Sequence, residues 1–236
     1  MDDTTIARQK EQIRRELLQT EAFHNAPPPR WGKAAERLRR LPSYRTAPCL
    51  LIPPLQAFRQ IALNALTDGK RLILTTPQLQ SGFSLVDPRA VPPHKRPQAV
   101  YPHRSNPFAQ RIDYRTQRPP RVDLILTSSL AVARDGSRLG DGSGHLDLLV
   151  ACLSQLGWLK KGTRIVTVVA PFQIVSPLPM KRTDVGVHWV LSDEETIATG
   201  WNQPLHMPLL WPRLDRKRIR RNDVLFYLSR KRSRHP

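Results

Sequence analysis

Residues 49–76 read CLLIPPLQAFRQIALNALTDGKRLILTT, and this stretch decides the fold class. The apolar runs 49–52 and 71–76 are typical of buried strands, and residues 58–70 have the apolar spacing of a helix that ends at Gly69. A strand, a helix and a second strand in this order form a parallel unit, because the helix carries the chain back across the sheet. The stretch therefore predicts an α/β protein.

The flanking sequence extends the same pattern. Further strands are predicted at 122–127, 164–169, 188–191 and 196–199, and further helices at 4–22, 31–41 and 145–156. The first helix is amphipathic, with Ile6, Ile13, Leu17 and Leu18 on its apolar side. We expect one α/β domain with three layers, a mostly parallel sheet with helices on both faces, similar to a Rossmann-like fold.

Length and composition exclude several classes of protein. The chain has 236 residues, of which 39% are hydrophobic and 24% charged, so it can build a real core and is neither wholly disordered nor fibrous. No run of 18 apolar residues predicts a transmembrane helix, and the first residues lack the apolar segment of a secretory signal. Cys49 and Cys152 lie in apolar runs and are interpreted as buried, reduced thiols. We expect a cytoplasmic protein, monomeric rather than oligomeric, with no membrane contact.

The charge is the unusual property. Lys and Arg number 38 against 19 acids, for a net charge of +19, which concentrates anions near the surface. Residues 213–234 hold ten of these cations, and two interpretations stay open: a nucleic-acid contact through phosphates, or a solvated tail on a short packed helix. We divide the chain into a domain at 1–200, with a Pro/Arg-rich loop insertion at 88–120, and a basic C-terminal extension at 201–236.

The best candidate for chemistry follows the strand at 122–127. Three glycines alternate at Gly140, Gly142 and Gly144 just before a helix, where backbone N–H groups and the helix dipole favour an anion. Arg138 can pair with phosphate oxygens, and Asp147 in the first helical turn can hold Mg²⁺ or favour the helix dipole. By itself this pattern is equally consistent with a tight glycine-rich connection.

These residues resemble the signature of the 5-formyltetrahydrofolate cyclo-ligase family, which contains Arg-Leu-Gly-x-Gly-x-Gly-x-x-Asp. The chain keeps this pattern from Arg138 to Asp147, together with Gly136 before it. Lys10 and Arg14 match the family's N-terminal Lys-x-x-x-Arg helix. Other matching positions are Gln173 and Asp184. The segments around 75–93 and 196–200, and the Trp-Pro-Arg-Leu tail, look more like a divergent branch of methenyltetrahydrofolate-synthetase-domain proteins.

The resemblance implies an ATP- and Mg²⁺-dependent ligase of one-carbon metabolism. In the family, the formyl oxygen of 5-formyltetrahydrofolate attacks the γ-phosphate of ATP, and N10 then closes the ring to 5,10-methenyltetrahydrofolate with release of ADP and phosphate. Carried over, Arg138 is catalytic, Asp147 binds Mg²⁺, and a reduced folate or related small molecule is the partner. The implied nucleotide-binding residues are Lys10, Arg14, Gly140, Asp141, Gly142, Ser143, Gly144 and His145.

The chain departs from the family pattern on the folate side. The departures are Ser128-Ser129 for Pro-Gly, Val132-Ala133 for Phe-Asp, His145-Leu146 for two tyrosines, His188 for the second aspartate, and Gln56 in place of a glutamate. The alternative is therefore a non-catalytic nucleotide- or RNA-binding relative with a degenerate folate site. In that case Lys10 and Arg14 can be a solvated helix face and His145 an exposed histidine.

Overall fold

The structure is a computed structural model that describes residues 2–26, 29–76, 79–101, 106–113, 121–205 and 207–234. The helices are α1 (Asp3–Gln19), α2 (Glu21–Asn25), α3 (Trp31–Arg40), α4 (Pro42–Arg45), α5 (Arg59–Thr67), α6 (Arg96–Ala99), α7 (His145–Gln155), α8 (Arg216–Arg221) and α9 (Asp223–Arg234). The strands are β1 (Cys49–Ile52), β2 (Arg71–Thr75), β3 (Phe83–Val86), β4 (Gln110–Arg111), β5 (Val122–Thr127), β6 (Ala131–Ala133), β7 (Arg138–Leu139), β8 (Leu159–Val168), β9 (Ile174–Val175), β10 (Trp189–Leu191) and β11 (Thr196–Ala198).

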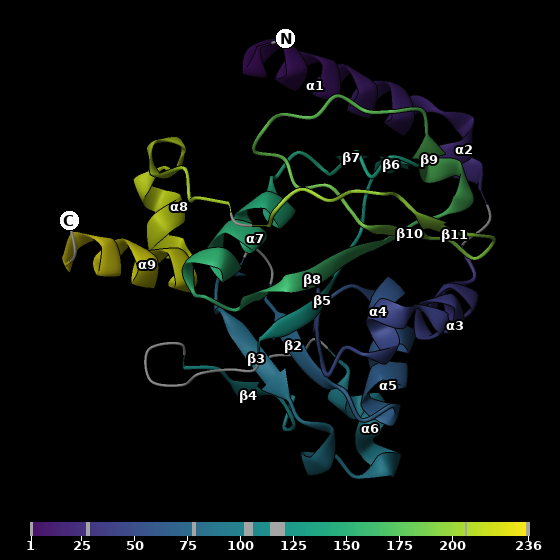
Figure 1. Cartoon of the computed structure of the whole chain (residues 1–236), viewed down its shortest axis with the longest axis vertical. Coiled ribbons are helices and arrows are strands. Elements are labelled where there is room, and N and C mark those ends of the chain that lie inside the picture. The colour runs from purple at the N-terminus through teal and green to yellow at the C-terminus, as the bar shows by residue number, and fades with distance from the viewer. Residues whose placement is uncertain are drawn as a thin grey trace.

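The main sheet confirms the predicted α/β architecture (Figure 1). Its eight described strands follow the order β11-β10-β8-β5-β1-β2-β3-β4. The five strands from β10 to β2 are parallel, and antiparallel pairings occur only toward the two edges. Parallel strands need both faces covered, which is why β1 is apolar throughout and β5 is mostly apolar in the sequence.

The two faces of the sheet hold separate cores. Along β1, Leu50 and Ile52 join the core beneath α3 and α5, whereas Cys49 and Leu51 join the core beneath α7 and α9. Figure 1 shows α3 to α6 gathered on one side of the sheet and α7 to α9 on the other. The alternation follows from the two-residue period of a strand. Cys49 and Cys152 are free thiols in the α7 core, and burial raises the pKa of each to about 12.

A second, three-stranded sheet in the order β7-β6-β9 carries α1. The region after β5, expected to be an irregular glycine-rich loop, thus contains an antiparallel hairpin of β6 and β7. Ile13 and Leu17 pack on this sheet, but Leu18 is 46% exposed, so the prediction that Leu18 belongs to the apolar side is wrong. The helix predicted at 4–22 also ends early, because Thr20 adopts extended backbone between α1 and α2.

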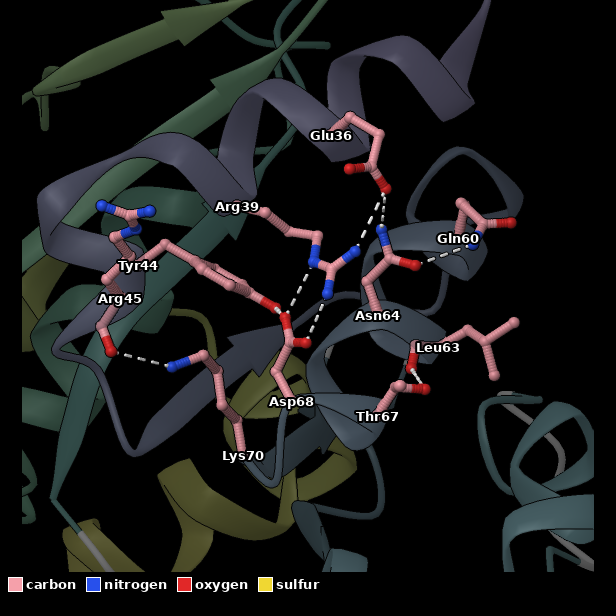
Figure 2. A network of polar contacts seen from close by, with 10 residues as sticks. All are labelled: Glu36, Arg39, Tyr44, Arg45, Gln60, Leu63, Asn64, Thr67, Asp68 and Lys70. Atoms are coloured by element: carbon pink, nitrogen blue, oxygen red, sulfur yellow. Dashed lines mark hydrogen bonds and ion pairs between the residues drawn. The ribbon is translucent and has the colours of Figure 1, made fainter.

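Figure 2 shows a polar network at the amino end of β2. Asp68 accepts from Arg39 at 3.0 and 2.6 Å and from the Tyr44 hydroxyl at 2.7 Å. Lys70 donates to the backbone carbonyls of Ala47 and Arg45 at 2.8 and 3.2 Å. Burial would raise the pKa of Asp68, but its bonds to Arg39 and Tyr44 hold that pKa below the ordinary value. The network fixes α3 and α4 against α5 and β2.

Two segments outside the regular α/β units also contribute to the cores. Within 88–113, Val91, Ala99 and Val100 pack with the α5 side, while residues 102–105 and 114–120 lie outside the described part of the chain. In α9, Val224 and Leu225 are fully buried in the core of α7. Among the described residues, none of the helices has both the length and the apolar character to cross a bilayer.

Candidate functional site

A cavity of about 760 Å³ opens at the carboxyl ends of the parallel strands. Pro53 follows β1, Thr76 follows β2 and Ser128 follows β5, and all three residues line the cavity. Helix α1 and the loop between β7 and α7 supply further walls. Ligands of open α/β sheets bind at this edge, because the loops that follow parallel strands converge there.

Arg138 is a buried cation that lines this cavity. The residue is 9% exposed, and its hydrogen bonds are long, from Nε to the Ser129 hydroxyl at 3.3 Å and from Nη2 to the Ser128 carbonyl at 3.5 Å. In the described part of the chain it forms no ion pair within 4.0 Å. Burial lowers the pKa of Arg138, and the negative charge of Asp147 offsets part of this effect. The guanidinium stays protonated near neutral pH. A buried guanidinium that has carboxylates nearby but, among the described residues, none at ion-pair distance favours an anionic ligand.

The glycine loop, residues 140–144, passes both cavity arginines, with Gly140 next to the guanidinium of Arg138 and Gly142 next to that of Arg14. A Cβ at Gly140 would lie 2.9 Å from Nη2 of Arg138, so a larger residue would displace the guanidinium from its position. Gly142 has φ of +96°, a conformation that other residues rarely adopt. Asp141 accepts from the Ser143 backbone N–H at 3.0 Å and from its hydroxyl at 2.7 Å, and these bonds lower the pKa of Asp141. The conformation of the loop is therefore fixed by its own hydrogen bonds and glycines, and the loop leads directly into the first turn of α7.

Helix α1 brings two more cations to the cavity. Lys10 and Arg14 both line it, as their i, i+4 spacing predicts. Lys10 forms an ion pair with Asp184 at 2.5 Å, and both side chains are largely buried. The Nε of Arg14 donates to the Gly140 carbonyl at 2.9 Å, which ties α1 to the glycine loop.

Asp147 can serve a magnesium ion that arrives with a nucleotide. Its Oδ1 accepts from the Val185 N–H at 2.8 Å, which leaves Oδ2 for a cation, and burial raises the pKa of this carboxyl. The described residues hold no cluster of three or more His, Cys, Asp or Glu side chains fit for a metal. Mg²⁺ commonly takes one or two carboxylates and completes its shell with phosphates and water. The donor set fits a nucleotide-borne ion and not one held by protein ligands alone.

The departures from the family pattern have structural roles. Val132 is fully buried in β6, and Leu146 packs into the core of α7. Ser129 bonds Thr167 at 2.9 Å beneath the Arg138 guanidinium. His145 is the first residue of α7 and is half-buried, and burial lowers its pKa.

Gln173, singled out in the sequence, also lines the cavity. Its amide group spans the backbone of two segments: Nε2 donates to the Ser129 carbonyl at 2.9 Å, and Oε1 accepts from the Ala170 N–H at 2.7 Å. Gln173 therefore holds the segment between β5 and β6 in place. Because both polar atoms of its amide already bond backbone groups, they are not available to a ligand.

Two cavity residues were missed from the sequence. Lys181 lines the main cavity and donates its backbone N–H to Asp184 at 2.6 Å. Arg218 of α8 donates from Nη2 to the Ser143 carbonyl of the glycine loop at 3.2 Å. The charge run at 213–234 marked the second segment, but no local pattern indicates that it reaches residue 143.

The profile of the 5-formyltetrahydrofolate cyclo-ligase family matches residues 6–193. A methenyltetrahydrofolate synthase domain-containing protein from Bos taurus is 27% identical over 203 residues, which covers 82% of this chain and 52% of that protein. The protein of the same description from Homo sapiens is 25% identical over 198 residues, covering 81% and 51%. The chain thus spans about half the length of these relatives. In fold, it is similar to the solved 5,10-methenyltetrahydrofolate synthetase of Aquifex aeolicus, with a TM-score of 0.51, 17% identity, and coverage of 84% and 94%.

Proposed function

Because the chain belongs to the 5-formyltetrahydrofolate cyclo-ligase family, we propose that it acts as an ATP-dependent ligase on 5-formyltetrahydrofolate or a closely related reduced folate. The products are 5,10-methenyltetrahydrofolate, ADP and phosphate. The observation that supports the proposal is the buried guanidinium of Arg138 beside Gly140, which forms no ion pair with any described residue. Such a preorganised charge stabilises a phosphoryl group in transfer without reorganising during the reaction.

Each group of cavity residues has a task in this reaction. The glycine loop and Arg14 hold the nucleotide phosphates, and Lys10 exchanges part of its ion pair with Asp184 for a phosphate oxygen. Arg138 meets the charge that develops on the γ-phosphoryl group as the formyl oxygen attacks it. Asp147 holds Mg²⁺, which when bound neutralises phosphate charge. Catalysis rests on positioning and charge, since phosphoryl transfer of this kind needs no protein nucleophile.

Turnover tests the proposal directly. The purified protein is mixed with Mg-ATP and 5-formyltetrahydrofolate, and the near-ultraviolet absorbance of the methenyl product is followed. We expect ATP-dependent product, and a loss of at least about 100-fold in kcat/KM in Arg138→Ala, the size seen when one preorganised donor is removed. Arg138→Lys keeps the charge but not the forked geometry, so its kcat/KM should lie between those of the natural chain and Arg138→Ala.

Arg134→Ala is the matched control, because Arg134 lies four residues before Arg138 and pairs with Glu195 on the surface. Its rate should stay within about twofold of the natural chain, since an exposed ion pair contributes little. A folded Arg138→Ala variant with undiminished turnover would contradict the assignment of this site.

A second function is favoured by the distribution of acids around the cavity. The carboxylates that line it, Asp141, Asp147 and Asp184, all lie near the glycine loop and α7, and the wall from Pro53 to Leu55 carries none. A site without a carboxylate on the β1 side is poorly equipped for a polar folate ring. A chain that binds Mg-ATP but yields no product with reduced folates would be a non-catalytic nucleotide-binding relative.

A further inference from the structure

A second cavity, of about 320 Å³, lies between the glycine loop and α8. Ser143 and His145 line both this cavity and the main one. Its basic wall consists of Lys217, Arg218 and Arg221 from α8. The loop that contacts Arg138 on the main cavity therefore also borders a second basic pocket.

The charge in this second cavity is not balanced by acids. Asp215 is the acidic residue among those that line it, and its Oδ1 already accepts from the Arg218 backbone N–H at 2.6 Å. Within the described ranges, Lys217 and Arg221 take part in no ion pair or hydrogen bond of their side chains. Three cations and one carboxylate line this pocket, and the excess of positive charge makes it attractive to an anion.

The basic wall is also held in place. Arg218 donates to the Ser143 carbonyl at 3.2 Å, and Asn222, which is 3% exposed, accepts from the Leu225 N–H at 2.9 Å at the junction of α8 and α9. Asp223 forms an ion pair with Arg111 at 2.5 Å. Figure 1 shows α8 and α9 on the side of the sheet that carries α7. The cations are thus displayed from a packed element, which lowers the entropy lost when a ligand binds.

We propose that the glycine loop and α8 form an outer anion subsite that binds the phosphate group of a small phosphorylated ligand. The match to the family profile ends at residue 193, so α8 adds this wall to the site from outside the matched region. A ligand with a phosphate dianion neutralises more of the charge of three cations than a ligand with one carboxylate does. Guanidinium groups also pair with phosphate oxygens in a forked geometry. The subsite does not depend on the ligase reaction.

The matched experiment compares two double variants of one helix. Lys217→Gln with Arg221→Gln removes two cations that line the outer anion subsite. Arg216→Gln with Arg220→Gln removes two exposed cations of α8 that do not line it. Both lower the net charge equally, and all four positions are exposed, so folding is little affected. Pyrophosphate binding is measured by calorimetry on the full chain, and again in an Arg138→Ala background to remove the contribution of the main cavity.

We expect the first pair to weaken pyrophosphate binding by about tenfold or more, since each charge-assisted hydrogen bond is worth more than a neutral one. The second pair should weaken it by less than about twofold at moderate salt, because only the screened field changes. Equal losses in both pairs would show a diffuse charge and overturn the proposal, as would the absence of pyrophosphate binding to the natural chain. If the natural chain binds a single-stranded RNA tightly, and both double variants lose that binding equally, α8 is a nucleic-acid surface instead and the proposal is wrong.

Discussion

At the scale of single residues, His188 shows how the tertiary structure assigns a role that a family pattern would misplace. The residue stands where the family has an aspartate. Its imidazole Nδ1 accepts from the Ile165 backbone N–H at 3.0 Å, and its backbone N–H donates to the Ile165 carbonyl at 2.9 Å. Burial, with a smaller contribution from Arg164, lowers the pKa of His188 to about 4. The imidazole is a neutral hydrogen-bond acceptor beside β8 and not a ligand of the site.

The pH dependence of stability tests this role. The unfolded chain protonates His188 near its ordinary pKa of 6.5, whereas the folded chain resists protonation until about pH 4. The contribution of neutral His188 to the free energy of unfolding should therefore be fully present above pH 6.5 and decrease as the pH drops. About 2 kcal/mol should be lost through this residue between pH 7.5 and 5. Urea titrations at both pH values measure it. His188→Asn, which offers a non-titrating acceptor, should lose about 2 kcal/mol less over the same interval; an identical loss would refute the assignment.

At the scale of elements, Asp68 joins three helices of one face. It follows α5 and accepts from Arg39 of α3 and Tyr44 of α4 (Figure 2). Asp68→Ala leaves the Tyr44 hydroxyl without this acceptor in a buried position and should lower the free energy of unfolding by about 2–3 kcal/mol. Tyr44→Phe removes one hydrogen bond and should cost about 1 kcal/mol. Urea unfolding gives both values, and similar costs for the two variants would contradict the three-helix role.

The ATP binding that we propose supplies an internal control for Asp68→Ala. The network lies at the amino end of β2, whereas Thr76, just beyond the carboxyl end of that strand, lines the main cavity. Because the two features are at opposite ends of the strand, the folded variant should keep the ATP affinity of the natural chain. A large loss of affinity would mean that the network also shapes the site.

At the scale of the whole molecule, the C-terminal segment decides whether residues 1–200 can fold alone. Val224, Leu225 and Leu228 belong to the core shared by α7 and the main sheet. A chain that ends at residue 200 also lacks the buried Leu205 and Leu209, so five buried aliphatic side chains are removed. At about 1.5–3 kcal/mol each, it should lose about 8 kcal/mol or more from a total of order 5–15 kcal/mol. Circular dichroism with urea unfolding checks this. A truncated chain with the full unfolding midpoint would support the division at residue 200 predicted from the sequence.

The sequence by itself determined the α/β class and the positions of the parallel strands along the chain. Predictions at 49–52 and 122–127 coincide with β1 and β5, because strands buried on both faces must be apolar throughout and their ends are marked by proline or polar residues. The signature from Arg138 to Asp147 indicated the glycine loop for a similar reason: tight backbone geometry restricts residue identity locally. The short strands β6, β7 and β9 were missed, because two or three residues carry no measurable period.

Only the tertiary structure decided which distant residues meet around the glycine loop. Lys10 meets Asp184 across 174 positions, and Arg218 reaches Ser143 across 75, through contacts that no local pattern encodes. It also decided that Arg138 is a buried cation with no ion pair to the residues that the structure describes, whereas the similar Arg134 is paired on the surface. The physical reason is that burial and charge pairing depend on the packing of separate elements, while strand and turn propensities act within a few residues.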